Sequence, residues 1–225
     1  MATATKLKTI HLQLPITTEQ LAALELGTVV YLTGRVYTAR EGVYKRAVED
    51  GAGLPASPEA LGFANFHCSP AATLNPDGSA TVGAVTATAS FRFAKWLDGF
   101  FALSRCNLIL GKGGMTSEIY KRSFVPNGAI YLTTVGYGTG ALLGRGIRRV
   151  AATYWVAELG LAQAIWVLEV ENFGPFLVDS DLAGNSLFER ENAKIAPGIE
   201  ALYAGTKPAT MRRYGETDDK TDEVI

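Results

Sequence analysis

The chain has 225 residues, which suits one large domain or two small ones. Hydrophobic residues make up 48% of the sequence, so a full core can form and global disorder is excluded. The 21 basic and 22 acidic residues leave a net charge of −1, which provides no general attraction for nucleic acid or an anionic membrane. Any basic site must therefore be local.

Cysteine and histidine are both scarce in this sequence. The two cysteines, Cys68 and Cys106, cannot form a disulfide scaffold and fit a reducing cytosol. With only two histidines beside them, a self-contained zinc or iron–sulfur site is not expected. No apolar run approaches the roughly 20 residues of a spanning helix, and the first 14 residues lack a signal-peptide core. We expect a cytoplasmic protein with no nucleic-acid or membrane partner and no metal ligands of its own.

The first part of the chain predicts two strands, each followed by a helix with a capping box. The strands are Thr9–Leu14 and Thr28–Thr38, and the helices run from Thr17 through Leu26 and from Ala39 to Glu49. In a capping box, a threonine and a glutamine or glutamate three residues later each bind the other's backbone N–H group. Thr17 with Gln20 and Thr38 with Glu41 have this spacing. Gly34 predicts a bend in the second strand.

The rest of the chain alternates short β-rich runs with helical segments. The strands are expected at Gly62–Cys68, Ser79–Thr86, Asn107–Leu110, Ala129–Thr134, Ala164–Val170 and Phe176–Val178. The helices are expected at Ala89–Ser104, Thr116–Arg122, Thr139–Ala151 and Leu187–Ala204, and Asn75–Gly78 is expected to join the first two of these strands as a hairpin turn. This mixture predicts an α/β fold, with a mixed sheet and surrounding helices in one domain over residues 1–211. The polar residues 212–225 predict a disordered tail.

Three cations, Arg40, Arg92 and Lys112, each follow a predicted strand at or near the start of a helix. The dipole of a helix opposes a cation at its N-terminus, so three such positions indicate a bound anion between them. Ligands of open α/β sheets bind at the carboxyl ends of strands. Two arginines and a lysine suit two carboxylates, because an arginine grips a carboxylate with two hydrogen bonds. The alternative is that all three are solvated surface cations.

Further residues near these cations refine the prediction. Thr88 precedes Arg92 by four residues, so on a helical turn both side chains would share one face. The glycines around Lys112, Gly111 and Gly113, allow backbone N–H groups to converge on an anion. The Walker pattern is absent because Cys106 stands where it needs a glycine, so a triphosphate site is not supported.

Two other motifs leave alternatives open. Gly136–Ala141 satisfies the GxGxxA pattern, with Glu158 about 20 residues further on, and this resembles a dinucleotide-binding fingerprint. Helix packing explains these glycines equally well. His67 next to Cys68 could form a metal pair, but with no second histidine nearby it is better read as a hydrogen-bonding residue of the site.

The order of motifs resembles a known family. Tyr31–Gly34 followed by Thr38–Glu41 is similar to the YLTG and TARD signature of the β subunit of class I fumarate hydratases and L(+)-tartrate dehydratases. Further matches occur in the same order at Phe66–Pro70, Thr88–Arg92, Gly111–Met115, Glu158–Gly160, Phe173–Pro175 and Gly184–Leu187. The resemblance covers roughly residues 8 to 205.

The resemblance implies a hydro-lyase that adds or removes water at a C4 dicarboxylate. It implies a swivelling β/β/α domain that closes over a [4Fe–4S] cluster held by an α subunit, in an αβ or (αβ)2 assembly. Arg40 and Arg92 would bind substrate carboxylates, with Gly111, Gly113 and His67 also at the substrate. Lys112 would stabilise the charge formed on proton loss, and Thr88 would sit at the transferred proton as the proposed base. A free hydroxyl is a poor base, so Thr88 would need a charged partner, plausibly a carboxylate of the α subunit.

The chain departs from the family pattern at two positions. Tyr44 stands where the family commonly has a histidine, and Phe91 lies in the stretch before Arg92 that usually reads Pro-Thr-Thr-Ala-Gly. Both residues could reshape the pocket and leave the exact acid open. The rival readings are a divergent homologue that binds an acid without turnover, and a nucleotide-dependent oxidoreductase that uses Gly136–Ala141. Thr88 as an ordinary helix cap is the structural alternative to its proposed role.

Overall fold

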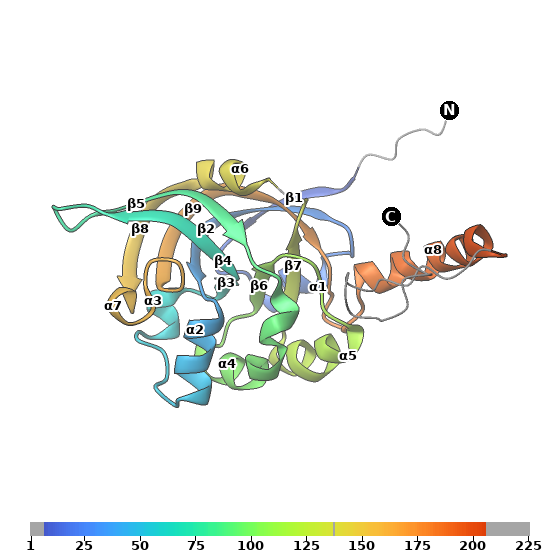
Figure 1. Cartoon of the computed structure of the whole chain (residues 1–225), viewed down its shortest axis with the longest axis horizontal. Helices are drawn as coiled ribbons and strands as arrows, with labels where there is room; N and C mark the ends of the chain where they lie inside the picture. Colours follow the sequence, from blue (N-terminus) through green and yellow to red (C-terminus); the bar gives the residue numbers. More distant parts are fainter. Residues whose placement is uncertain (1–6, 137, 206–225) are drawn as a thin grey trace, which may run out of the picture. The chain divides into compact units, whose positions relative to one another are not determined.

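The computed structural model describes residues 7–136 and 138–205, and a seven-stranded mixed sheet is its central element (Figure 1). In sheet order the strands are β1 (Thr9–Gln13), β2 (Val29–Thr38), β3 (Ala64–Phe66), β6 (Leu108–Gly111), β7 (Ile130–Thr134), β9 (Ile165–Val178) and β8 (Ile147–Tyr154). The first five are parallel, whereas β9 runs antiparallel to β7, β8 and β2. Because β9 pairs with both β2 and β7, strands β2, β3, β6, β7 and β9 form a closed circuit of pairing.

Successive side chains of the central strands enter two separate cores, as the two-residue period of a strand requires. Leu108 and Leu110 of β6 lie in one core and Ile109 in the other. Likewise, Trp166 packs on the first side and Val167 on the second. The sheet is therefore buried on both faces, which agrees with its nearly continuous apolar strands.

Helices cover one face of the sheet. They are α2 (Glu41–Tyr44) with η1 (Lys45–Glu49), η2 (Ser90–Trp96) with α4 (Leu97–Ser104), and α5 (Ser117–Ile119) with η3 (Tyr120–Phe124) and η4 (Val125–Asn127). Figure 1 shows α2, α4 and α5 together on this side. Aromatic residues dominate the core beneath them, including Tyr44, Phe100 and Phe124, all fully buried. Trp96 and Phe101 belong to the same core.

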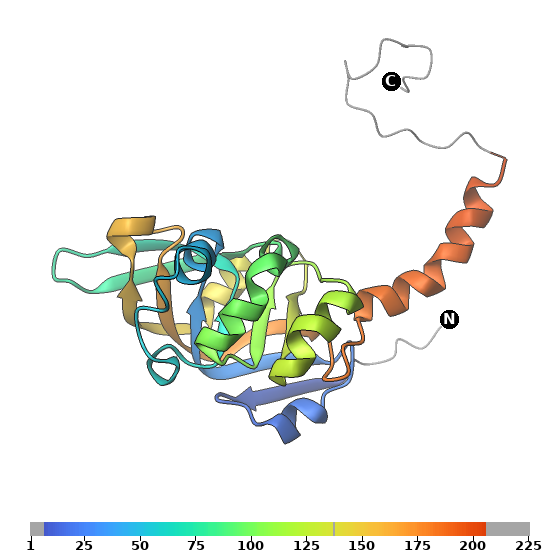
Figure 2. The same ribbon diagram turned by 90° about the horizontal axis from the view of Figure 1, so that it is seen from below.

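A two-stranded hairpin, β4 (Cys68–Leu74) with β5 (Ala80–Ala87), belongs to the other face. Its tip projects from one side of the molecule (Figures 1 and 2). The turn at Asn75–Gly78 is present as predicted, and the Asp77 carboxylate accepts hydrogen bonds from Ser79. The strand before the turn is β4, however, and not the expected Gly62–Cys68, whose β3 part pairs with β2 and β6 in the main sheet. Val85 of the hairpin is fully buried in the first core together with Leu143 of α6 (Gly140–Arg145). Hairpin, sheet and helices thus form β, β and α layers, which confirms the expected α/β class.

The remaining helices are short, apart from the last. They are α1 (Thr18–Ala22), α3 (Pro58–Leu61), α7 (Val156–Leu159) and α8 (Leu187–Tyr203). The capping box of Thr17 and Gln20 is present at α1, as predicted. However, α1 ends at Ala22 rather than Leu26.

Three other local predictions were wrong. The helix expected over Thr139–Ala151 ends at Arg145, and the chain then enters β8, whose pairing with β9 overrides its helical pattern. The runs around Ala164–Val170 and Phe176–Val178 are parts of one strand, β9. The second capping box is absent, because the Thr38 hydroxyl instead donates to the Ala164 carbonyl and accepts from the Trp166 N–H. Arg40 is the residue that precedes α2, and its side chain makes no capping bond.

The chain divides into two compact units, the first ending at Glu189 and the second starting at Arg190 within α8. All the elements of the sheet belong to the first unit. The single domain over residues 1–211 stays a prediction, and the expected tail at 212–225 lies outside the described residues. No helix within the described ranges is both long and apolar enough to cross a membrane.

Glycines in α6 let this helix lie directly on the backbone of β5. A Cβ atom at Gly144 would overlap the carbonyl oxygen of Gly83, and one at Gly140 would overlap that of Val85. We predict that Gly144→Ala lowers the free energy of unfolding by about 1–3 kcal/mol, as expected for overpacking. Urea unfolding measures this free energy. The control is Leu142→Ala, at a half-exposed position of the same helix. A more stable Gly144→Ala protein would contradict this close contact.

Candidate functional site

Backbone hydrogen bonds bring the ends of four strands together at one edge of the first unit. Beyond β2, the Ala39 N–H donates to the Phe66 carbonyl at the end of β3. After β5, the Thr88 N–H donates to the His67 carbonyl, with 2.6 Å between N and O. The Lys112 N–H, just after β6, donates in turn to the Thr88 carbonyl at 3.1 Å. Segments that carry Arg40, Thr88 and Lys112 are therefore neighbours. Arg92, the third cation of the strand-end argument, lies in η2, four residues after Thr88.

Thr88 lies between β5 and the 3₁₀ helix η2, outside both. Its side chain is half-buried, and Ala89, not Thr88, is the residue that caps η2. The helix-cap alternative for Thr88 is therefore wrong. The prediction that Thr88 and Arg92 share a helical face is also wrong, because the helix begins only after Thr88 and has three residues per turn.

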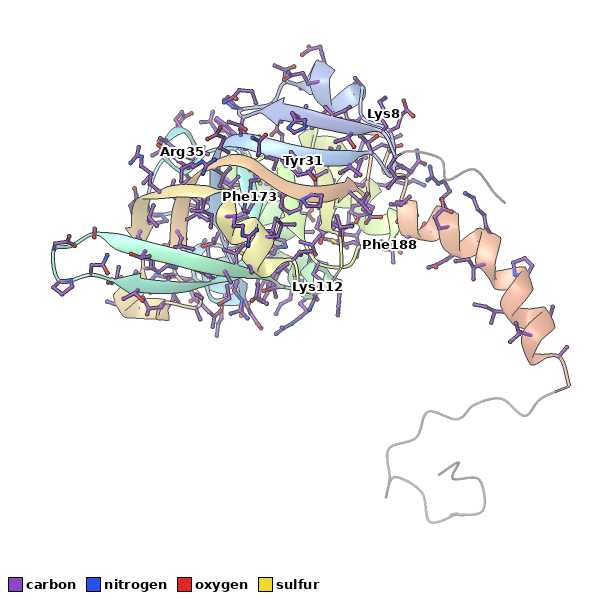
Figure 3. The ribbon with its side chains drawn as sticks, turned by 90° about the horizontal axis from the view of Figure 1, so that it is seen from above. Lys8, Tyr31, Arg35, Lys112, Phe173 and Phe188 are labelled. Atoms are coloured by element: carbon purple, nitrogen blue, oxygen red, sulfur yellow. The ribbon has the colours of Figure 1, made fainter. Side chains whose placement is uncertain are left out.

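Lys112 lines a cavity of about 360 Å³ at this edge. The walls come from the end of β5 (Ala84–Ala87), from Thr134 at the end of β7, and from residues around Gly140 of α6. Figure 3 shows Lys112 beside the end of the hairpin and near α6. Lys112 is the one cation among the described residues that line this cavity. An anionic group that enters the cavity would therefore meet a single positive charge.

The loop after Lys112 does not form the full anion nest that its glycines suggest. Lys112 donates its N–H to Thr88, and Met115 donates its own to the Tyr120 hydroxyl at 2.9 Å. Gly113 has a φ of +70°, so the turn itself needs a glycine there. Two of the four N–H groups from Lys112 to Met115 are thus already used within the protein.

Arg40 has an unsatisfied donor. Its Nη1 donates to the Ala162 carbonyl at 3.2 Å, whereas its Nε is buried without an acceptor among the residues the structure describes. Leaving a charged donor unpaired in the interior costs free energy, so such a group indicates a missing acceptor. Burial raises the pKa of the Cys68 thiol, and the nearby positive charge of Arg40 partly opposes this rise.

Arg92 has a protein partner in Glu41, the residue after Arg40. Its Nη2 and the Glu41 carboxylate are 2.9 Å apart, and both side chains are about half exposed. An ion pair this exposed contributes about 0–1 kcal/mol, so a ligand carboxylate could replace Glu41 at little cost. Phe91 beside Arg92 is 61% exposed, unlike the other aromatic residues of η2 and α4.

His67 and Gly111 lie in the interior beneath the edge. Both ring nitrogens of His67 are engaged, Nε2 with the Tyr44 hydroxyl and Nδ1 with the Ser90 hydroxyl, each at 2.7 Å. Burial lowers the pKa of His67 from 6.5 to about 3, so the imidazole is neutral. A Cβ at Gly111 would overlap the Ser90 hydroxyl. The substrate contacts expected for His67 and Gly111 stay predictions.

The structure adds one acidic residue that the sequence analysis did not single out, Asp179. Its carboxylate accepts from the Tyr120 hydroxyl and from the Phe188 N–H, and burial raises its pKa. A Cβ at Gly114 would press on this carboxylate, so Asp179 and Tyr120 together support the loop that carries Lys112. The available signal was the position of Asp179 directly after the apolar end of β9, just ahead of the Gly184–Leu187 motif.

The glycines of Gly136–Ala141 have structural explanations. Gly140 packs on the β5 backbone, and Gly136 and Gly138 have positive φ values of 92° and 88° in the turn before α6. Glu158, the acidic residue of the proposed dinucleotide fingerprint, lies in α7 with its carboxylate 3.8 Å from Arg46. It does not line the cavity at Lys112. Helix packing therefore accounts for this motif better than a nucleotide does.

Neither cysteine offers a metal ligand. Cys68 and Cys106 are buried, and burial raises the pKa of both thiols, that of Cys106 to about 11. Cys68 packs in the first core and Cys106 in the second, so the two thiols do not meet at one site. Within residues 7–136 and 138–205, no three His, Cys, Asp or Glu side chains form a group that could hold a metal ion. The side chains described here do not fit an iron–sulfur cluster.

Fold and site together define an α/β domain with Arg40, Arg92 and Lys112 beyond the ends of its strands. The family model described as Fumarase C-terminus matches residues 1–191, and the chain belongs to that family. It is 31% identical over 183 residues to the L(+)-tartrate dehydratase subunit beta of Escherichia coli K12, covering 80% of this chain and 87% of that one. A Methanocaldococcus jannaschii protein provisionally given the same name is 35% identical over 192 residues, covering 83% and 95%. A Geobacillus stearothermophilus protein provisionally named fumarate hydratase class I is 29% identical over 188 residues, covering 84% of this chain and 35% of that one.

The buried His67 predicts a pH dependence of stability. Because its folded pKa is about 3 and its ordinary pKa is 6.5, the unfolded chain binds a proton there between these values and the folded chain does not. Stability is therefore lost as pH falls through this window, by up to about 1.4 kcal/mol per pH unit. Urea unfolding at pH 7 and pH 5 measures the loss.

The second histidine provides the control for this prediction. His11 is exposed, so His11→Gln should keep the wild-type dependence on pH. His67→Gln should reduce it. Equal slopes in the two variants would show that His67 is not the group responsible.

Proposed function

We propose that this chain is the β subunit of a hydro-lyase that adds water to, or removes it from, a C4 dicarboxylic acid of the fumarate or tartrate type. The observation that carries the proposal is the backbone hydrogen bonding beyond the strand ends, which makes neighbours of the segments that carry Arg40, Thr88 and Lys112. The names of the relatives, tartrate dehydratase subunit beta and class I fumarate hydratase, support the same reaction class. The acid itself is left open.

The two arginines would bind the substrate carboxylates. The buried Nε of Arg40 has no acceptor in the described chain, and a carboxylate would supply one. Arg92 already holds a carboxylate, that of Glu41, in a pair that a substrate could replace. A guanidinium holds each carboxylate by charge-assisted hydrogen bonds, which fixes the orientation of the carbon chain between the two ends.

Thr88 and Lys112 would act on the reacting carbons. Thr88 lies beside the proton that leaves the carbon next to one carboxylate, and Lys112 stabilises the negative charge that then develops on that carboxylate. Charge stabilisation of this kind lowers the barrier because the interaction strengthens as the charge forms. The threonine hydroxyl is too weak a base to work alone, so we propose that a carboxylate of the partner subunit activates it.

The reaction also needs a partner. The buried thiols Cys68 and Cys106 do not fit a cluster site, so we propose that an α subunit contributes the [4Fe–4S] cluster of the family. When bound, such a cluster supplies a Lewis acid for the departing hydroxyl. The site described here would then face the α subunit in an αβ or (αβ)2 assembly. The name "subunit beta" of the relatives agrees with such a partner.

The first test is reconstitution. The purified chain alone should contain no iron and show no activity, because its two buried cysteines cannot supply three ligands. Co-expression with a partner that carries three cluster cysteines should give brown, oxygen-sensitive material that hydrates fumarate or dehydrates a hydroxy acid. Iron and sulfide analysis measures the cluster content of the single chain and of the heteromer, and an absorbance assay measures their activity. Stoichiometric iron and sulfide in the single chain would contradict the division of roles.

The second test separates chemistry from binding. In the heteromer, Thr88→Ala should lower kcat by roughly 10²–10⁴-fold with little change in KM, as expected for a proton-transfer group. Lys112→Met should act similarly, since the charge it stabilises forms only after the proton leaves. Arg40→Ala should mainly raise KM and provides the matched contrast. If Thr88→Ala still exchanges deuterium at the substrate α-carbon at the wild-type rate, the base is another residue.

A further inference from the structure

A hydrogen-bonded network of buried side chains lies beneath the candidate site. The Tyr131 hydroxyl is 2.7 Å from the Ser90 hydroxyl, which is 2.7 Å from His67 Nδ1. On the other side of the ring, His67 Nε2 is 2.7 Å from the Tyr44 hydroxyl, which is 3.1 Å from the Asn65 side-chain oxygen. All five side chains are fully buried. They come from β7, η2, the β3–β4 junction, α2 and β3, so the network connects separate elements.

The hydrogen-bonding protons of this network have one consistent arrangement. The Asn65 amide nitrogen donates to the Tyr37 carbonyl at 3.3 Å, so its oxygen faces Tyr44 and accepts the tyrosine proton. Tyr44 must then accept from His67, which places the imidazole proton on Nε2. Nδ1 of the neutral ring is left to accept from Ser90, and Ser90 accepts from Tyr131. Every donor therefore points the same way, from Tyr131 to Asn65.

Ser90 connects this network to the site. It lies two residues after Thr88 and two before Arg92, and its N–H donates to the Lys112 carbonyl at 3.3 Å. Gly111, the residue before Lys112, lies so close to the Ser90 and Tyr131 hydroxyls that a Cβ there would overlap both. A movement of Ser90 would therefore shift the segments on both sides of the hydrogen bond from Lys112 to Thr88.

We propose that Tyr131, Ser90, His67, Tyr44 and Asn65 are positioning residues, which hold the backbone of Thr88 and Lys112 in a fixed relation. The proposal deepens the proposed function, since it concerns how that site is kept in place. Fully satisfied buried networks of this kind specify one arrangement, because breaking one bond leaves a polar group unpaired in the interior. None of these side chains needs to touch a ligand to act.

The arrangement of protons is tested in the isolated chain. With 15N-labelled imidazoles, the two histidines give a simple spectrum, and His11→Gln assigns the remaining signals to His67. We expect a neutral ring with its proton on Nε2 at pH 7. A proton on Nδ1, or a ring that titrates in the ordinary range of histidine, would overturn the network.

The positioning role is tested by amide exchange in the same isolated chain. Tyr131→Phe and Ser90→Ala each remove one hydroxyl, and the amides of Thr88, Ser90 and Lys112 should then exchange roughly tenfold faster. Tyr37→Phe removes a buried hydroxyl of the same core that does not belong to the network, and should leave these amides unchanged. Wild-type exchange in both Tyr131→Phe and Ser90→Ala would overturn the proposal, whatever reaction the site performs.

Kinetics in the heteromer then distinguish positioning from general stability. Tyr131→Phe should lower kcat roughly 10–100-fold with little change in KM, the size of effect that supporting residues have at other sites. Wild-type kcat in a Tyr131→Phe protein with accelerated exchange would contradict a positioning role. A wild-type heteromer that turns over no dicarboxylate would instead overturn the proposed function, and amide exchange would still decide whether the network holds Thr88 and Lys112.

Discussion

Backbone pairing that continues past the ends of the strands is the interaction on which the site depends. The bonds from Thr88 to the His67 carbonyl and from Lys112 to the Thr88 carbonyl extend the sheet by one more row. This row joins a strand of the hairpin to the parallel strands of the main sheet. The hairpin and the seven-stranded sheet thereby share one edge, and residues from both lie together at the candidate site.

The packing around this edge leaves little freedom. Gly111 meets two hydroxyls, Gly114 meets the Asp179 carboxylate, and Gly140 meets the carbonyl of Val85. Each contact requires the absence of a side chain, so the glycines near Lys112 are explained by the density of their surroundings. The edge keeps a small cavity lined by Lys112, a buried Arg40 Nε without an acceptor among the described residues, and an exposed ion pair between Arg92 and Glu41. Such an edge is suited to a ligand that arrives with its own negative charges.

Sequence patterns predicted the elements that depend on local signals. The capping box at Thr17 and the hairpin turn at Asn75–Gly78 need only neighbouring residues, and both are present. Strand β8 was missed because its identity depends on pairing with β9 rather than on its own residues. The three cations were found from their positions after strands, whereas Glu41 and Asp179 act through partners 51 and 59 residues away. No local spacing indicates such a partner, so these contacts were visible only in the fold.

The closed circuit of strands has a consequence for how the chain folds. β2 pairs with β9 in contacts such as Val29 with Leu177 and Tyr37 with Val167, which join the first and last parts of the sheet. Contacts between residues so far apart in sequence carry a large entropic cost of loop closure and slow the folding of a domain. During synthesis, β2 must wait for nearly the whole first unit before β9, its third neighbour, exists. Until then its hydrogen-bonding groups on that side are exposed, and this is the period in which the nascent chain is most open to mispairing.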